Sequence, residues 1–182
     1  AEPHVIQVTR EVLPPLAPTG RLAADGIGYV RVPEVNEQAP LAIRAEVERL
    51  QAAGARSLVL DLRGCARGPL ESGVDAARLF VASGTLGLFE ARGTERRTIT
   101  AGPGDGSLTL PLAVLVDGGT SGAAELLASA LSANARAELI GERTLGRTAT
   151  QRLLPLPDGG ALWLSSAWYL TPGGDPIHER GI

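Results

Sequence analysis

Cysteine, histidine and aromatic residues are scarce in this sequence. Cys65 is the only cysteine, so the chain forms no internal disulfide and no thiolate zinc site. The two histidines, His4 and His178, lie at opposite ends of the chain, and no short group of Asp and Glu residues replaces them. We therefore expect no metal site. Aromatic residues make up only 3% of the chain, which disfavours a base-stacking surface.

Clustered charge and long apolar runs are also missing. The net charge is −3 without blocks of one sign, so we expect no nucleic-acid partner. No apolar run approaches the ~20 residues of a membrane-spanning helix, and we expect no transmembrane segment in this fragment. The chain begins at Ala1 without a signal peptide or an initiator Met. We interpret it as a mature or excised fragment.

The order of strand and helix patterns predicts an α/β fold. Residues 57–62 (SLVLDL) and 111–116 (PLAVLV) are nearly unbroken apolar runs, as in buried parallel strands. A glycine-containing turn and an amphipathic helix follow each of them. This alternation predicts a central, largely parallel sheet with flanking helices.

The remaining patterns divide the chain. We expect strands at residues 26–32, 57–62, 111–116 and 137–141, and helices at residues 41–53, 70–81 and 121–134. Residues 151–156 and 161–169 flank PDGG, which predicts a C-terminal β-hairpin. Residues 4–10 alternate like a short strand, and the prolines of residues 14–18 indicate a linker. We therefore separate an N-terminal strand and linker, residues 1–25, from a core domain, residues 26–182.

Two turns are the candidate functional sites. One covers residues 63–70 and the other residues 117–125, and each joins a buried strand to the start of a helix. The first backbone N–H groups of a helix have no partner within it and carry a partial positive charge. Such groups can stabilise a developing oxyanion.

The order of the motifs resembles the C-terminal processing (tail-specific) peptidases. Residues 58–63 (LVLDLR) are similar to the strand that opens their oxyanion turn, and residues 116–125 (VDGGTSGAAE) resemble their nucleophile elbow, Thr/Ser-Ala-Ser-Ala-Ser-Glu. Residues 141–147 (GERTLGR) resemble their Gly-Glu-x-Thr-Phe-Gly-Lys segment, and Gln151 falls where they carry a Gln. Residues 167–182 match their closing Thr-Pro-x-Gly-x-x-Ile…Gly-Ile pattern. The ordered set is specific, although each motif alone is weak.

This resemblance implies a fold and an activity. Members of the family are serine endopeptidases that use a Ser-Lys dyad on a ClpP/crotonase-like α/β core, without a cofactor. Their substrates are extended peptides or C-terminal tails, and the resemblance implies a periplasmic, secreted or cell-envelope location. A PDZ domain usually precedes the core. Residues 7–11 (QVTRE) resemble the last strand of such a domain, so residues 1–25 are interpreted as a possible PDZ remnant.

Both catalytic positions depart from the family pattern. The nucleophile maps onto Gly122 and the lysine onto Arg147. Glycine has no side chain to form an acyl-enzyme, and arginine stays protonated, so it cannot serve as a general base. The oxyanion turn is also altered, because residues 65–68 (CARG) replace Asn-Pro-Gly-Gly. The matching oxyanion and peptide-binding positions are Arg67, Gly68 and Ala123.

The departures predict a pseudoprotease that binds extended peptides or regulates a partner, such as another protease. The alternative is an active serine-type endopeptidase with a displaced nucleophile, Ser121 or Cys65. Ser121 lies one residue early, which turns its side chain by about 100° on a helix, and a helix N-cap is the commoner role. Cys65 has no His or Lys placed to activate it. A crotonase-like acyl-group enzyme is a third possibility, disfavoured by the closing Thr171-Pro172 pattern.

Simple structural roles are the favoured interpretation for the other polar candidates. We expect Arg147 to form an ion pair with Glu125 or Glu142, and binding of a peptide carboxylate or phosphate is the alternative. We expect Asp61 and Glu125 to stabilise turns rather than to act as general acids or bases. His178 lies in a polar stretch near the end of the chain, so we expect it at the surface.

Overall fold

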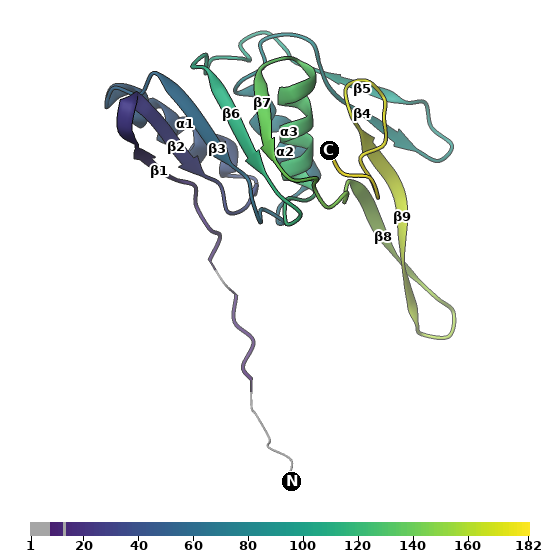
Figure 1. The fold of residues 1–182 in the computed structure, drawn as a ribbon. Coiled ribbons are helices and arrows are strands. Elements are labelled where there is room, and N and C mark those ends of the chain that lie inside the picture. Colours follow the sequence, from purple (N-terminus) through teal and green to yellow (C-terminus); the bar gives the residue numbers. More distant parts are fainter. Residues whose placement is uncertain (1–7, 13) are drawn as a thin grey trace.

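The computed structural model describes residues 8–12 and 14–182. Most of the strand expected at residues 4–10 therefore lies outside the described residues. Residues 8–12 have no regular secondary structure and are exposed. The described chain then joins the body of the molecule at β1, Thr19–Leu22 (Figure 1).

The central sheet has five strands in the order β1-β2-β3-β6-β7. The strands β2, β3, β6 and β7 run parallel, and β1 is antiparallel to β2. A short 3₁₀ helix, Ala24–Gly26, joins β1 to β2. The four parallel strands, all expected from sequence, are Ile27–Arg31 (β2), Ser57–Asp61 (β3), Leu112–Val116 (β6) and Ala137–Gly141 (β7).

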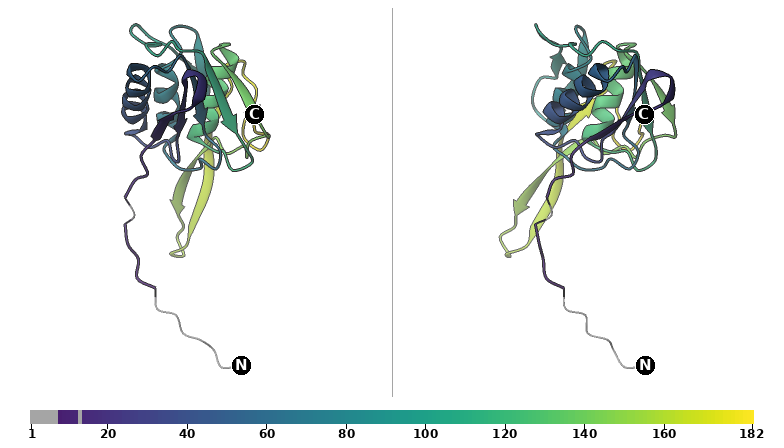
Figure 2. Two further views of the ribbon diagram at one scale, coloured as in Figure 1. Left: turned by 60° about the vertical axis from the view of Figure 1, so that its left-hand side comes forward. Right: turned by 90° about the vertical axis from the view of Figure 1, so that its left-hand side faces the viewer.

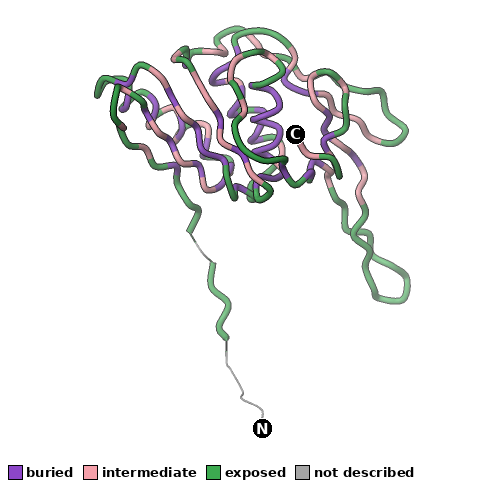
Figure 3. The backbone as a smooth tube through the Cα atoms, in the orientation of Figure 1, coloured by how far each residue is buried: buried purple, intermediate pink, exposed green. Residues whose placement is uncertain are grey.

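Three helices pack with this sheet. They are α1 (Ala39–Ala52), α2 (Leu70–Arg78) and α3 (Ala123–Ala133), within a few residues of the expected bounds. Leu58 and Leu60 of β3 are buried, while Val59 between them is only half-buried, because the helices cover one face of the sheet. Helix α3 is buried along almost its whole length (Figure 3).

A second sheet was only partly expected. It is antiparallel, in the order β5-β4-β9-β8. The expected hairpin forms β8 (Ala149–Pro155) and β9 (Ala161–Leu170), whereas β4 (Thr85–Ala91) and β5 (Arg97–Thr100) were missed. The fold is thus α/β, with a mixed, mostly parallel sheet and a separate antiparallel sheet. The tip of the β8–β9 hairpin extends beyond the body (Figure 2).

Candidate functional site

The two candidate turns lie side by side because they follow neighbouring parallel strands. Strand β3 pairs with β6, and both run into their turns at the same edge of the sheet. The backbone N–H of Ser121 donates to the carbonyl of Cys65 at 2.9 Å. The hydroxyl of Thr120 donates to the carbonyl of Leu62, also at 2.9 Å. These bonds join the turn of residues 117–125, called the elbow below, to the turn of residues 63–70, called the oxyanion turn.

Asp117 strengthens this junction. Its Oδ1 accepts the backbone N–H of Gly64 at 2.8 Å and that of Gly119 at 2.9 Å. The bond from Gly64 is the main cause that lowers the pKa of Asp117. A carboxylate that holds N–H groups from both turns fixes their spacing.

Asp61 stabilises the start of the oxyanion turn, as expected. It is 1% exposed and accepts two hydrogen bonds from the Arg63 guanidinium, at 2.9 and 2.8 Å, and one from the hydroxyl of Tyr29. Burial alone would raise the pKa of Asp61, but the bonds from Arg63 and Tyr29 outweigh it and lower the pKa to about 2. Asp61 is therefore a structural carboxylate.

Gly68, in the oxyanion turn, lies where no other residue fits. Its φ is +125°, and a Cβ there would lie 1.8 Å from the carbonyl oxygen of Val35. The neighbouring carbonyl of Arg67 accepts the N–H of Val35 at 2.9 Å. The side chain of Arg67 is exposed. The turn is thus packed directly on the chain that precedes α1.

Gly122 occupies a strained position with room beside it. It is the N-cap of α3, with φ +63° and ψ −120°. A Cβ built there would lie 3.6 Å from the carbonyl oxygen of Arg147 and 3.7 Å from Cδ2 of Leu70, which is ordinary contact. A side chain would therefore fit, although a positive φ is unfavourable for it. Ala123 follows as the first residue of α3, so its N–H has no partner within the helix.

The expectation that Ser121 caps α3 was wrong. Because the cap is Gly122, the capping bond comes from Glu125, whose Oε2 accepts the N–H of Gly122 at 2.9 Å. Ser121 instead lies inside the junction of the two turns and is 3% exposed. Thr120 bonds back to residues 62 and 117 rather than to the helix.

Glu125 connects the elbow to the segment that carries Arg147. It is fully buried and accepts the N–H of Arg147 at 2.7 Å, the N–H of Gly146 at 2.6 Å and the hydroxyl of Thr144 at 2.5 Å. With the bond from Gly122, all four donors meet one acceptor-only carboxylate. The expected ion pair was wrong in its atoms: Arg147 binds Glu125 through its backbone, not its guanidinium.

The last described residues pack on the same segment. The hydroxyl of Thr144 accepts the N–H of Ile182 at 2.9 Å. Gly181 has φ +70°, and a Cβ there would lie 2.2 Å from the carbonyl oxygen of Thr144. A Cβ on Gly146 would lie 2.9 Å from the N atoms of residues 179–181. These approaches explain why the 141–147 motif and the closing glycine occur together.

A cleft of about 290 Å³ lies beside this segment and is lined by Arg147, Ala149, Gln151 and His178. The structure thus places Gln151 and Arg147 in the lining of one cleft. His178 was expected at the surface, but it is half-buried, and its Nδ1 is buried without a hydrogen-bond partner among the described residues. Within the same described part of the chain, no carboxylate lies within 4 Å of the exposed Arg147 guanidinium.

Both candidate displaced nucleophiles are buried. Ser121 is 3% exposed. Cys65 is fully buried, and burial raises the pKa of its thiol to about 11. A thiol with this pKa is protonated at neutral pH, and the thiolate is the nucleophilic form.

Metal and membrane sites were searched over the same residues. Across residues 8–12 and 14–182, no group of three or more His, Cys, Asp and Glu side chains is placed to hold a metal ion. No helix in this part is long and apolar enough to cross a bilayer.

Comparison with known proteins assigns the family. The sequence profile of peptidase family S41 matches residues 26–182. The chain belongs to peptidase family S41. It is 34% identical over 185 residues to a carboxyl-terminal-processing protease of Synechocystis, and 28% identical over 177 residues to the carboxy-terminal processing protease CtpA of Bacillus subtilis. A chloroplastic carboxyl-terminal-processing peptidase of Arabidopsis thaliana is 34% identical over 157 residues.

Solved structures share the fold. The photosystem II D1 C-terminal processing protease superposes with a TM-score of 0.82 at 31% identity, covering 96% of this chain and 48% of that one. A lipoprotein of Streptococcus agalactiae, 19% identical, shares the fold with a TM-score of 0.66. The alignment with the Synechocystis protease includes 99% of this chain but only 43% of that protein. The alignment with the Bacillus protease includes 97% of this chain and 38% of that protein. It therefore spans less than half the length of these relatives.

Proposed function

We propose that this chain is a non-catalytic member of family S41 that binds extended peptides or protein C-terminal tails. One observation carries the proposal: Gly122 stands at the elbow, at the nucleophile position of the family motif, and has no side chain. Its surroundings would accommodate a side chain, since the nearest atoms to a Cβ lie at 3.6 and 3.7 Å. The position that matches the nucleophile therefore has room for a side chain and carries none.

The second departure removes the base. A lysine can lose its proton near neutral pH when it is buried, whereas an arginine keeps its charge. Arg147 is also exposed. Removing a nucleophile from a well-studied protease leaves only about 10³–10⁴-fold rate enhancement from binding and the oxyanion hole. Without a base as well, no covalent route through this site remains.

The cleft around Arg147 suits a carboxylate. The guanidinium and the Gln151 amide are donors, and His178 lines the cleft beside them. A free C-terminal carboxylate would accept hydrogen bonds from the two donors. A ClpP/crotonase-like core, a preceding PDZ domain, a location in the cell envelope or outside the cell, and regulation of a partner protease are further parts of the proposal that rest on family resemblance.

An active endopeptidase that uses Ser121 or Cys65 is the competing function. The burial of both side chains and the raised pKa of Cys65 argue against it. Cleavage that is abolished by Ser121→Ala or Cys65→Ala would establish it.

The proposal is tested with reduced, carboxymethylated α-lactalbumin, an unfolded polypeptide. We expect saturable binding, followed by fluorescence anisotropy, while mass spectrometry finds the probe intact. Arg147→Gln should weaken binding about tenfold, the value of one charged hydrogen bond. Arg143→Gln is the matched control, because Arg143 is also exposed and its guanidinium donates, among the described residues, to the carbonyl of Arg180. Absence of binding, or fragmentation of the probe, would refute the proposal.

A further inference from the structure

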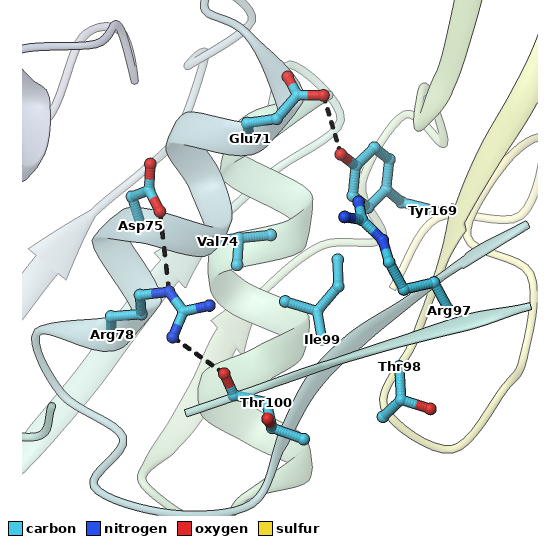
Figure 4. A pocket seen from close by; sticks show the side chains of 9 residues that line it. All are labelled: Glu71, Val74, Asp75, Arg78, Arg97, Thr98, Ile99, Thr100 and Tyr169. Atoms are coloured by element: carbon cyan, nitrogen blue, oxygen red, sulfur yellow. Dashed lines mark hydrogen bonds and ion pairs between the residues drawn. The ribbon is translucent and has the colours of Figure 1, made fainter. Parts of the chain in front are cut away.

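An open groove of about 370 Å³ runs between α2 and β5 (Figure 4). All four residues of β5 line one side, residues of α2 line the other, and Tyr169 closes the far wall. Its volume lies in the range of ligand pockets. Val74 and Ile99 point toward each other across the groove and form its apolar floor.

Strand β5 borders the groove with an open edge. It is the outermost strand of its sheet and pairs only with β4. The carbonyl of Thr100 faces α2, because it accepts a bond from Nη1 of Arg78 at 2.9 Å. Backbone groups two residues apart in a strand point the same way, so the N–H and C=O of Thr98 face this edge too. No described residue outside β4 forms a hydrogen bond with the backbone N–H or C=O of Thr98.

The two ends of the groove differ. Arg78 closes one end, since it bonds Thr100 and also Asp105 at 3.0 Å. The other end begins at Glu71, which accepts the hydroxyl of Tyr169 at 2.9 Å. Glu71 directly follows Leu70, the residue whose Cδ2 lies beside Gly122. The end of the groove at Glu71 is therefore the end nearer to Gly122.

We propose that an extended segment of a bound polypeptide adds to β5 as a fifth strand, with one end at Gly122. An extended chain supplies the backbone donors and acceptors that Thr98 lacks, as in other cases of strand addition. Its alternate side chains enter the groove against Val74 and Ile99, so the bound segment carries an apolar residue at every second position. This inference rests on the proposed function and locates the binding surface.

Thr98→Pro tests the pairing. Proline removes the N–H that faces the groove, and an edge strand tolerates it because that N–H takes no part in the bonds to β4. We expect binding of carboxymethylated α-lactalbumin to weaken about tenfold. Thr98→Val, which keeps the N–H, should bind within about twofold of the wild type.

Hydrogen exchange of the wild-type protein gives a readout that needs no variant. The amide of Thr98 should exchange more slowly when the probe is bound, because it then donates to the added strand. A different outcome is that the wild type and Thr98→Pro bind the probe equally well and that the exchange rate of the Thr98 amide does not change. In that case the groove assignment is wrong and the proposed function stands. If the wild type does not bind, both are wrong. Protection of Thr98 by protein concentration alone would instead assign the edge to a second copy of the chain, and contradict the inference.

Discussion

Gly122 and Arg147 are joined through a single atom. Oε2 of Glu125 accepts the backbone N–H of Gly122 at 2.9 Å and that of Arg147 at 2.7 Å. The arrangement depends on no side chain at either position. The two positions of the proposed degenerate dyad are therefore held together whatever side chain each carries.

Glu125→Gln should destabilise the protein by at least about 2 kcal/mol. The amide turns an NH₂ group toward backbone donors that then lack an acceptor, and each buried unsatisfied group costs about 1–3 kcal/mol. Thr144→Val, which removes one of the four donors, should cost about 1 kcal/mol. Urea unfolding measures both. Equal stability of Glu125→Gln and the wild type would mean that this carboxylate does not hold the site.

Asp61 should make the protein sensitive to acid. Its pKa in the folded state is about 2, below the usual 3.8, so its stabilising contribution is present above about pH 4 and is lost as the pH falls toward 2. The contribution amounts to about 2 kcal/mol. The stability difference between wild type and Asp61→Asn should therefore shrink over that range. Asp158→Asn, in an exposed turn, is the control. A stability difference between wild type and Asp61→Asn that stays constant from about pH 4 to about pH 2 would contradict the assignment.

Cys65 should be unreactive in the native protein. Burial raises the pKa of its thiol to about 11, so almost no thiolate exists at pH 8. We expect a thiol reagent such as dithionitrobenzoate to label it only after unfolding. Because the folded pKa is raised, stability should also fall as the pH rises from about 9 toward 11. Rapid labelling of the folded protein at pH 8 would contradict this and revive Cys65 as a nucleophile.

The sequence indicated the central sheet better than the second one. Apolar runs at residues 57–62 and 111–116 predicted β3 and β6, because buried parallel strands need such runs. Strand β5 has four residues, three of them exposed and polar, and its partner β4 is stabilised by β9, which lies far along the chain. Such a strand exists because of tertiary pairing, which local patterns do not encode.

The same limit applies to the site. The motifs marked Gly122, Arg147, Gln151 and Glu125, but not the shared oxygen that joins them, since that contact needs the folded geometry. The cap was assigned to Ser121 by residue preference, whereas the backbone placed Gly122 there. Leu70 and Thr144 were not singled out, because an apolar side chain and a single hydroxyl carry no catalytic signal.

Restoring both replaced residues should restore reactivity. There is room for a side chain at Gly122, so Gly122→Ser with Arg147→Lys rebuilds the family dyad on an existing frame. We expect this double variant to react with a fluorophosphonate, whereas Gly122→Ala with Arg147→Lys should not. A folded double variant that stays unlabelled would show that the altered turn at residues 65–68 also prevents reaction.

The wild-type protein gives the most direct test of lost catalysis. It is incubated with an excess of a serine-reactive fluorophosphonate at neutral pH, and its intact mass is then measured. With Gly122 in place of the nucleophile, we expect no mass increase. A stoichiometric adduct on Ser121, or on any other serine, would contradict the account and identify an active enzyme.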